Sequence, residues 1–231
     1  MELFSKDTLQ YTLFLSFIVQ IISIPFYLYG LLIPLGIEDV VLTDILKMET
    51  FVQIIEAVFY FWYFMTFTAV NDIAKFRYYD WFFTTPTMLL STIVYFEYKN
   101  FKELGLSKGM SLVSFLDNNK KEVLEITFYN MLMLVFGYLQ EIGSLDILYS
   151  TIFGFAAFGM SFYKMYTRYA KGNETNMTLY NSMLGIWALY GVAALMPNIT
   201  KNSMYNMLDI VAKNFYGFFL AYEIYKVKMN L

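Results

Sequence analysis

Two residue types are missing from this chain of 231 residues, cysteine and histidine. Without cysteine there can be no disulfide bond, no thiolate nucleophile and no zinc site built on thiolates. Without histidine the chain lacks the commonest metal ligand and the usual switch near neutral pH. Charged residues are scarce too, at 15% against about 25% in average soluble domains. We therefore expect no metal site and no enzyme, and a net charge of −3 is too small to indicate a nucleic-acid partner.

Hydrophobic residues, by contrast, make up 58% of the chain, and its mean hydropathy is +0.49. A helix that crosses a membrane needs about 20 apolar residues, so this length allows about seven such spans with short connections. Hydropathy places the spans at residues 11–35, 41–70, 73–95, 122–139, 145–166, 177–196 and 203–225. One longer polar connection, residues 97–121, separates the third span from the fourth. We predict an all-α membrane protein in which residues 1–231 form a single bundle of seven transmembrane helices.

The distribution of lysine and arginine predicts the orientation of the bundle, because these residues gather on the cytoplasmic side. The connections after the third and fifth spans share a side with the C-terminus, and this side carries Lys99, Lys102, Lys108, Lys120, Lys121, Lys164, Arg168, Lys171, Lys226 and Lys228. The opposite side carries Lys6, Lys75, Lys201 and, at its edge, Arg77. We therefore expect an integral, multi-pass protein in a lipid bilayer, with the N-terminus outside and the C-terminus in the cytoplasm.

One lysine, Lys213, lies inside the last apolar segment with no loop residue near it. A bare ammonium group at that depth costs about 2.5 to 3.5 kcal/mol on insertion scales. Asp209 precedes it by four residues, so the two side chains lie on one face of a helix. Two interpretations stay open at this point. The pair could be a structural buried ion pair, or Lys213 could form a Schiff base with a carbonyl cofactor.

A second apolar stretch favours the Schiff base. Residues 77–86 read Arg-Tyr-Tyr-Asp-Trp-Phe-Phe-Thr-Thr-Pro. This stretch resembles the third-helix pattern of microbial (type I) rhodopsins, Arg-Tyr-x-Asp-Trp-x-x-Thr-Thr-Pro, at every fixed position. Asp209 and Lys213 resemble the seventh-helix pattern, Asp-x-x-x-Lys. Through Asp80, Thr84 and Ser91 the chain is most similar to the Asp-Thr-Ser rhodopsins of large algal viruses, and a viral source would place it in a host-cell membrane.

The resemblance implies a cofactor and a set of roles. All-trans retinal would be covalently bound to Lys213 as a protonated Schiff base, with Asp80 and Asp209 as its counterions and Asp80 as proton acceptor. Arg77 lies one turn from Asp80 and should stabilise the charged form of that carboxylate. Thr84 could hydrogen-bond the same carboxylate, or it could be an ordinary helix threonine that bonds its own backbone.

Ser91 marks a departure from the strongest proton pumps of the family. Those pumps carry a carboxylate seven residues after the Thr84 position as internal proton donor, and a serine cannot supply a proton at neutral pH. The connection from Pro197 to Asn202 also lacks the glutamates that strong pumps use for proton release, and Lys201 stands near the place of one of them. We therefore expect reprotonation from the cytoplasm to be slow or to use water.

The family's retinal pocket can be carried over by position. It would take Trp81, Thr85 and Met88 from the third span, and Met133 and Gly137 from the fourth, with Asn130 one turn before. The fifth span would supply Phe153, Ala157 and Met160, and the sixth Trp187 and Tyr190. Two further family positions, a proline and a second tryptophan, are Gly191 and Ala194 here. Aromatic and methionine stripes are more often plain helix packing, so this pocket depends on Lys213 and Asp80.

The second span carries two further carboxylates, Glu49 and Glu56, seven residues apart and so on one helix face. Residues 51–70 around Glu56 are nearly all apolar, whereas Glu49 could lie in water at the membrane edge. Such a stripe resembles cation-conducting rhodopsins, since carboxylate-lined paths favour cations. Asn214 could add a polar constriction, or it could simply face a neighbouring helix. We expect Glu56 to tune ion passage with little effect on colour.

Two functions stay open. The chain could be a light-driven outward proton pump through Asp80, which Arg77 and Thr84 favour. It could instead be a light-gated cation channel lined by Glu49, Glu56 and Asn214, which Ser91 and the missing release glutamates favour. A light sensor that signals through a partner is less favoured, because no transducer segment is attached. We expect protons or small cations as partners, and a homo-oligomer is compatible with the sequence.

Overall fold

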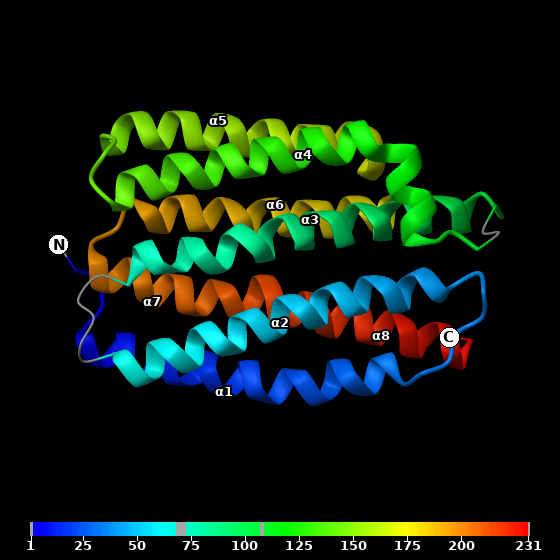
Figure 1. Ribbon diagram of the computed structural model, residues 1–231, viewed down its shortest axis with the longest axis horizontal. Helices are drawn as coiled ribbons and strands as arrows, with labels where there is room; N and C mark the ends of the chain where they lie inside the picture. Colours follow the sequence, from blue (N-terminus) through cyan, green and yellow to red (C-terminus); the bar gives the residue numbers. More distant parts are fainter. Residues whose placement is uncertain (1, 68–72, 107–108, 231) are drawn as a thin grey trace.

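The computed structural model describes residues 2–67, 73–106 and 109–230. Its helices lie side by side and almost parallel to one long axis (Figure 1). They are α1 (Lys6–Leu31), α2 (Val40–Thr66), α3 (Ala74–Glu103), α4 (Leu112–Glu141), α5 (Ile147–Met165), α6 (Glu174–Ala194), α7 (Asn198–Asp209) and α8 (Phe215–Met229). Two π-helical turns extend them: η1 (Tyr166–Ala170) continues α5, and η2 (Ile210–Asn214) joins α7 to α8 into one long helix.

The predicted seven-helix bundle is thereby confirmed, with the seventh helix formed by α7, η2 and α8. The N-terminus and the C-terminus lie at opposite ends of the bundle (Figure 1), as seven passes require. Helices α4 and α5 form one edge of the bundle, α1 and α2 form the other, and α3, α6 and α7 lie between them. Which end faces the cytoplasm remains a prediction.

The bundle has an apolar outside and a partly polar inside, the reverse of a soluble protein. Large hydrophobic side chains such as Tyr11, Val58 and Phe128 are 58% to 75% exposed. Buried polar side chains, by contrast, line the inner faces of α1, α2, α3 and α7. By length and composition, α1 and α4 are apolar enough to cross a membrane. The exposed hydrophobic surface fits a protein that is solvated by lipid, in which helices satisfy their own backbone groups.

The connection between the third and fourth helices is shorter than predicted. We expected a polar loop over residues 97–121, but α3 continues to Glu103 and α4 begins at Leu112. A capping box between Ser111 and Ser114 starts α4, and Asn119 interrupts its helical geometry at φ −120° and ψ 20°. The bend is visible at one end of the bundle (Figure 1). Hydropathy marks where apolar sequence ends, whereas capping decides where a helix ends.

Other helix ends differ for similar reasons. Helix α1 begins at Lys6 rather than at residue 11, because the side chain of Ser5 accepts a hydrogen bond from the backbone of Thr8 at 3.1 Å. Helix α7 begins at Asn198, directly after Pro197, rather than at residue 203. Helix α2 ends at Thr66, and the predicted end of the second span, residue 70, lies outside the described residues.

Candidate functional site

Lys213 lies in the π-helical turn η2, in the middle of the bundle. In such a turn a backbone amide bonds the carbonyl five residues earlier, and here Phe215 donates to Ile210. Single π-helical turns inside α-helices occur frequently at functional sites. The side chain of Lys213 is 4% exposed, so its ammonium group has to be satisfied by the protein. The structure therefore places the amine where it requires anionic partners.

Three carboxylates surround the amine, each from a different helix. Nζ of Lys213 donates to Glu56 of α2 and to Oδ2 of Asp80 of α3 at 3.0 Å, and it lies 3.4 Å from Oδ1 of Asp209 of α7. A second buried cation, Arg77, pairs with Oδ2 of Asp209 at 3.2 Å. The cluster thus carries one more carboxylate than cation. Because buried charges are costly unless paired, it is suited to take up one further proton or cation.

The two aspartates differ in how completely they are bonded. Asp209 accepts from the hydroxyl of Tyr60 at 2.7 Å and from that of Tyr190 at 2.8 Å, in addition to Arg77. Asp80 accepts from Lys213 through Oδ2, whereas its Oδ1 is buried and has no partner within the described part of the chain. Asp209 is therefore held in place, while Asp80 keeps an acceptor free.

Two expected contacts of Asp80 are not formed. Arg77 makes no ion pair with Asp80 among the described residues, and it is bound instead by Asp209, Asn202 and Asn206. Thr84 donates to the backbone carbonyl of Asp80 at 3.0 Å rather than to its carboxylate. It is thus the ordinary helix threonine that the sequence had left as an alternative. Both differences leave Lys213 as the hydrogen-bond donor to the Asp80 carboxylate.

Glu56 lies against Lys213, although its sequence context predicted a role in ion passage with little effect on colour. Its side chain is fully buried, and one carboxylate oxygen accepts from Nζ of Lys213. The other oxygen accepts from Nε2 of Gln20 at 2.8 Å. Glu56 therefore belongs to the carboxylates around the amine. The distance along the chain, 157 residues, concealed the contact.

A cluster of side-chain amides continues from Glu56. Nδ2 of Asn214 donates to Gln53 at 3.0 Å, to Gln20 at 3.1 Å and to Ser23 at 2.9 Å, and Gln20 returns a bond to Asn214 at 3.1 Å. Gln53 also donates to Gln20. We call Gln20, Gln53 and Asn214 the amide cluster. Asn214 thus faces neighbouring helices, α1 and α2, as one of the two alternatives had it, and its place in a constriction on an ion path stays a prediction. Gln20 and Gln53 were not among the predicted site residues, although glutamine within an apolar span was a signal.

Glu49 lies one turn beyond Gln53 on the same face of α2. It is 1% exposed, which excludes the solvated position at the membrane edge. Its carboxylate accepts from the hydroxyl of Ser91. Tyr216 of α8 reaches the same place, with its hydroxyl 3.4 Å from Ser91 and 3.1 Å from Thr92. A carboxylate therefore lies beside Ser91 after all, supplied by α2 rather than by α3.

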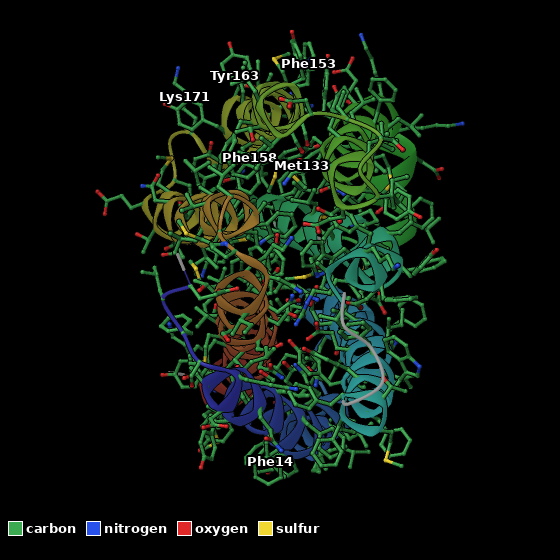
Figure 2. All side chains as sticks on the ribbon, turned by 90° about the vertical axis from the view of Figure 1, so that its left-hand side faces the viewer. Phe14, Met133, Phe153, Phe158, Tyr163 and Lys171 are labelled. Atoms are coloured by element: carbon green, nitrogen blue, oxygen red, sulfur yellow. The ribbon has the colours of Figure 1, made fainter. Side chains whose placement is uncertain are left out.

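Together these side chains form a buried array that we call the polar row: Arg77, Asp209, Lys213, Asp80, Glu56, the amide cluster, Glu49 and Ser91. Ion pairs and hydrogen bonds link its members from Arg77 to the amide cluster, and Glu49, bonded to Ser91, lies one turn further along α2. An end-on view shows nitrogen and oxygen atoms gathered between α1, α2 and α7 (Figure 2). At one end of the row Asn206 donates to Thr12 at 3.0 Å. Lys201, near that end, pairs with Glu141 at 2.7 Å. Asn206, Tyr60 and Glu141 were not among the predicted site residues.

On its other side Lys213 borders a largely apolar cavity of about 120 Å³. Seven predicted pocket residues line it: Trp81, Thr85, Met88, Met133, Gly137, Trp187 and Tyr190. Asn130, one turn before Met133, donates to Thr85 at 2.8 Å. The absence of a side chain at Gly137 matters here, because a Cβ atom would lie 2.4 Å from the hydroxyl oxygen of Tyr78.

The fifth helix contributes other residues than predicted. Ala157 and Met160 do not line the cavity, and neither does Phe153; Met160 is 40% exposed and Phe153 48%. The face of α5 that meets the cavity carries Ser150, Thr151, Gly154, Phe155 and Phe158. Phe158 and Met133 point to the interior, whereas Phe153 lies at the periphery (Figure 2). The charged residue of α5, Lys164, lies in its last turn, so the sequence offered no charge in the middle of the helix to fix its register.

Two positions at which the chain departs from the family pattern also lie at the cavity. Gly191 and Ala194, which replace a proline and a tryptophan, both line it. A Cβ atom on Gly191 would lie 2.4 Å from the ring of Phe155. Phe155 therefore fills space that a larger residue at position 191 would need.

Comparison with known proteins gives one family. The model of bacteriorhodopsin-like proteins matches residues 7–227. The viral rhodopsin OLPVRII is 29% identical, with a TM-score of 0.81 over 95% of this chain and 98% of its own. No curated protein sequence matches the chain.

Two more distant structures share the fold. The proton-pumping rhodopsin AR2 from the marine alga Acetabularia acetabulum is 16% identical, with a TM-score of 0.70 and all of both chains covered. Xanthorhodopsin, a light-driven ion pump with a dual chromophore, is also 16% identical, with a TM-score of 0.72 over 96% of this chain and 93% of its own. The family model matches nearly the whole chain, and a buried lysine lies at the predicted position. This chain therefore belongs to the bacteriorhodopsin-like family of microbial rhodopsins.

Proposed function

We propose that this chain holds retinal on Lys213 and moves cations across a membrane when it is illuminated. Proteins of its family are integral membrane photoreceptors or ion transporters that bind retinal through a lysine. The residues present fit the group, since a largely apolar and aromatic cavity ends at the amine of Lys213. The indole nitrogen of Trp81, which lines the cavity, is buried and has no partner within the described residues.

Retinal, when bound, would supply absorption of visible light and a change of shape on isomerisation. The chain's own residues would then decide where charge moves. Asp80 is suited to accept a proton from Nζ of Lys213, because Oδ2 lies 3.0 Å from that nitrogen and hydrogen-bond reach is the first requirement for proton transfer. Asp209 is held by Arg77, Tyr60 and Tyr190, and so serves as a fixed counterion.

The observation that carries the proposal furthest is the polar row. Glu56 joins the amine to the amide cluster, and Glu49 with Ser91 continues the row towards the end of the bundle where the C-terminus lies. Carboxylates and amides along a buried path favour cations, and an excess carboxylate next to Lys213 would attract one. We therefore favour a light-gated cation channel along Glu49, Glu56 and Asn214, closed in this conformation by the mutual hydrogen bonds of the amide cluster.

Outward proton pumping is the second candidate. It is favoured by the contact between Lys213 and Asp80, which would give the first proton transfer, and by the contact between Glu49 and Ser91. Glu49 could return a proton from the place where strong pumps carry their donor. The same residues would then act in sequence as proton sites rather than as the walls of a path.

The two candidates differ in the voltage dependence of the photocurrent. We would record it in a planar membrane under a sodium or potassium gradient, for the parent and for Glu56→Gln. Glu125→Gln is a matched control, because Glu125 lies on α4 in a half-exposed pair with Lys164, away from the polar row. A channel current reverses near the equilibrium potential of the cation and falls in Glu56→Gln but not in the control. A current that keeps its sign at every gradient would contradict the channel and support the pump.

A further inference from the structure

Helix α1 approaches the seventh helix closely just beyond Lys213. Gly217 and Ala221 lie four residues apart on α8, a spacing of small residues that lets membrane helices come together. A Cβ atom on Gly217 would lie 2.0 Å from the hydroxyl oxygen of Tyr27 and 2.1 Å from the ring carbon that bears it. Gly30 lies almost one turn after Tyr27 and meets Ala221. A Cβ atom added at Gly30 would lie 3.3 Å from the Cβ atom of Ala221. The ring of Tyr27 therefore packs directly against the backbone of Gly217, where any larger residue would displace it.

The hydroxyl of Tyr27 reaches the backbone that carries the amine. It lies 2.9 Å from the carbonyl oxygen of Asn214 and 3.3 Å from that of Lys213, and the residue is 1% exposed. Here the π-helical turn η2 gives way to α8, so the register of backbone hydrogen bonds changes by one residue. Carbonyl groups at such a junction need donors in a place without water. Tyr27 supplies one from another helix.

The same face of α1 also holds the side chain of Asn214. Gln20, Ser23 and Tyr27 are spaced by three and four residues, so they project from one side of the helix. Gln20 and Ser23 bond the amide of Asn214 at 3.1 Å and 2.9 Å. Helix α1 therefore fixes both the side chain of Asn214 and the backbone on either side of it.

We infer that Tyr27 is a positioning residue for Lys213. Its hydroxyl acts through the backbone of η2, and the absence of a side chain at Gly217 leaves room for its ring. By bonding the carbonyl groups of residues 213 and 214, Tyr27 sets where the lysine side chain starts. Nζ is thereby kept between Glu56 and Asp80. The inference rests on the proposed function only where it concerns bound retinal, since the restraint on η2 belongs to the protein itself.

The test compares Tyr27→Phe with Tyr29→Phe in the full chain. The first removes the hydroxyl and keeps the ring, while Tyr29 lies two residues further on the same helix and is 64% exposed. In the retinal-free protein we expect amide hydrogen exchange over residues 210–218 to be roughly fivefold faster in Tyr27→Phe, the size expected for the loss of one buried hydrogen bond. After retinal addition we expect a shifted absorbance maximum and faster bleaching by hydroxylamine in the dark. Tyr29→Phe should match the parent in all three measurements.

Gly217→Ala provides a second route that does not alter Tyr27. The added methyl group would displace the ring, so the same three changes are expected, with a lower thermal midpoint. The double variant Tyr27→Ala/Gly217→Ala has room for the methyl group but no hydroxyl. It should recover most of the thermal midpoint and keep the spectral change, so the two effects separate even if Gly217→Ala alone folds poorly.

A purely structural role would lower the thermal midpoint of Tyr27→Phe while leaving exchange over residues 210–218 and the absorbance maximum unchanged, and that result would overturn the inference. Failure of the proposed function is distinguishable, because the parent would then stay colourless with retinal while exchange in the retinal-free variants still responds.

Discussion

Glu56 of α2 and Lys213 of η2 form a buried ion pair across 157 residues of chain. Through its second oxygen Glu56 also binds Gln20 at 2.8 Å, so one carboxylate joins the amine to the amide cluster. A residue in this position acts on two properties at once. It contributes to the negative charge around the amine, and it forms part of the path on which the channel proposal depends.

Glu56→Gln should therefore change the colour of the retinal-bound protein, contrary to what the sequence suggested. Removing a negative charge next to a cationic chromophore lowers its excitation energy, so the absorbance maximum should move to longer wavelength. Asp80→Asn should shift it in the same direction, because Oδ2 of Asp80 is bonded to the same amine. Visible spectra at neutral pH provide the measurement, with Glu125→Gln as control. If Glu56→Gln absorbs like the parent, Glu56 is not a counterion.

The sequence predicted the parts of the site that local spacing can reach. Asp209 and Lys213 are four residues apart, and the stretch from Arg77 to Thr85 lies on one helix, so their common faces followed from helical periodicity. The contact of Glu56 with Lys213 depends on how α2 packs against η2, which no local pattern reports. The register of α5 failed for the same reason, since its apolar residues occur on every side.

Helix lengths were predicted less well than helix number. Hydropathy located seven apolar segments, but α3 and α4 extend into polar sequence, where capping by Ser111 and the kink at Asn119 determine the geometry. The π-helical turn at Lys213 left no signal in composition. Carbonyl groups in this turn accept from the hydroxyl of Tyr27 on another helix, a contact that no local pattern reports.

Lys213→Ala should abolish visible absorbance after retinal addition, and it should also destabilise the retinal-free protein. Removing the cation leaves Glu56 and Asp80 buried without their ion-pair partner. Breaking a buried pair in this way costs about 3 to 5 kcal/mol of unfolding free energy. The comparison is Lys164→Ala, whose half-exposed pair with Glu125 should contribute about 1 kcal/mol or less. Denaturant unfolding in detergent measures both, and a coloured Lys213→Ala protein would refute the assignment of the retinal site.

Ser91→Asp tests whether Glu49 already serves as the proton source at this end of the polar row. In the single variant Ser91→Asp, with Glu49 intact, the new carboxylate would lie against Glu49. Two carboxylates that share one site tend to hold a single proton between them. We therefore expect Ser91→Asp to accelerate reprotonation of Nζ of Lys213 modestly in the parent and strongly in a Glu49→Gln background. Glu49→Gln alone should slow that step.

The parent, Ser91→Asp, Glu49→Gln and the double variant form a double-mutant cycle. Flash photolysis of these four proteins measures the interaction between the two positions. Equal acceleration in both backgrounds would mean that Glu49 and position 91 act independently. The contact between Ser91 and Glu49 would then be structural, and the second function candidate would lose its donor.

Glu2 clamps the N-terminal segment onto the start of α7, outside the membrane-spanning part. Its carboxylate accepts from the backbone amides of Ile199 at 3.0 Å and Thr200 at 2.9 Å, and from the hydroxyl of Thr200 at 2.8 Å. Desolvation opposes ionisation, but these hydrogen bonds outweigh it and lower the pKa of Glu2 below its ordinary value. Helix α7 has no side-chain cap of its own at Pro197, so Glu2 takes that role.

A carboxylate with a lowered pKa in the folded state contributes its stabilisation above its unfolded pKa and loses it as the pH falls through the folded value. The clamp should therefore hold at neutral pH and open in acid below the ordinary range of a glutamate. Hydrogen exchange at the amides of Ile199 and Thr200, corrected for intrinsic rates, would rise over that pH window. Glu2→Gln keeps an acceptor oxygen but no charge, so exchange should be faster at neutral pH and should no longer depend on acid. Exchange that is equally protected in parent and variant at every pH would show that Glu2 does not cap α7.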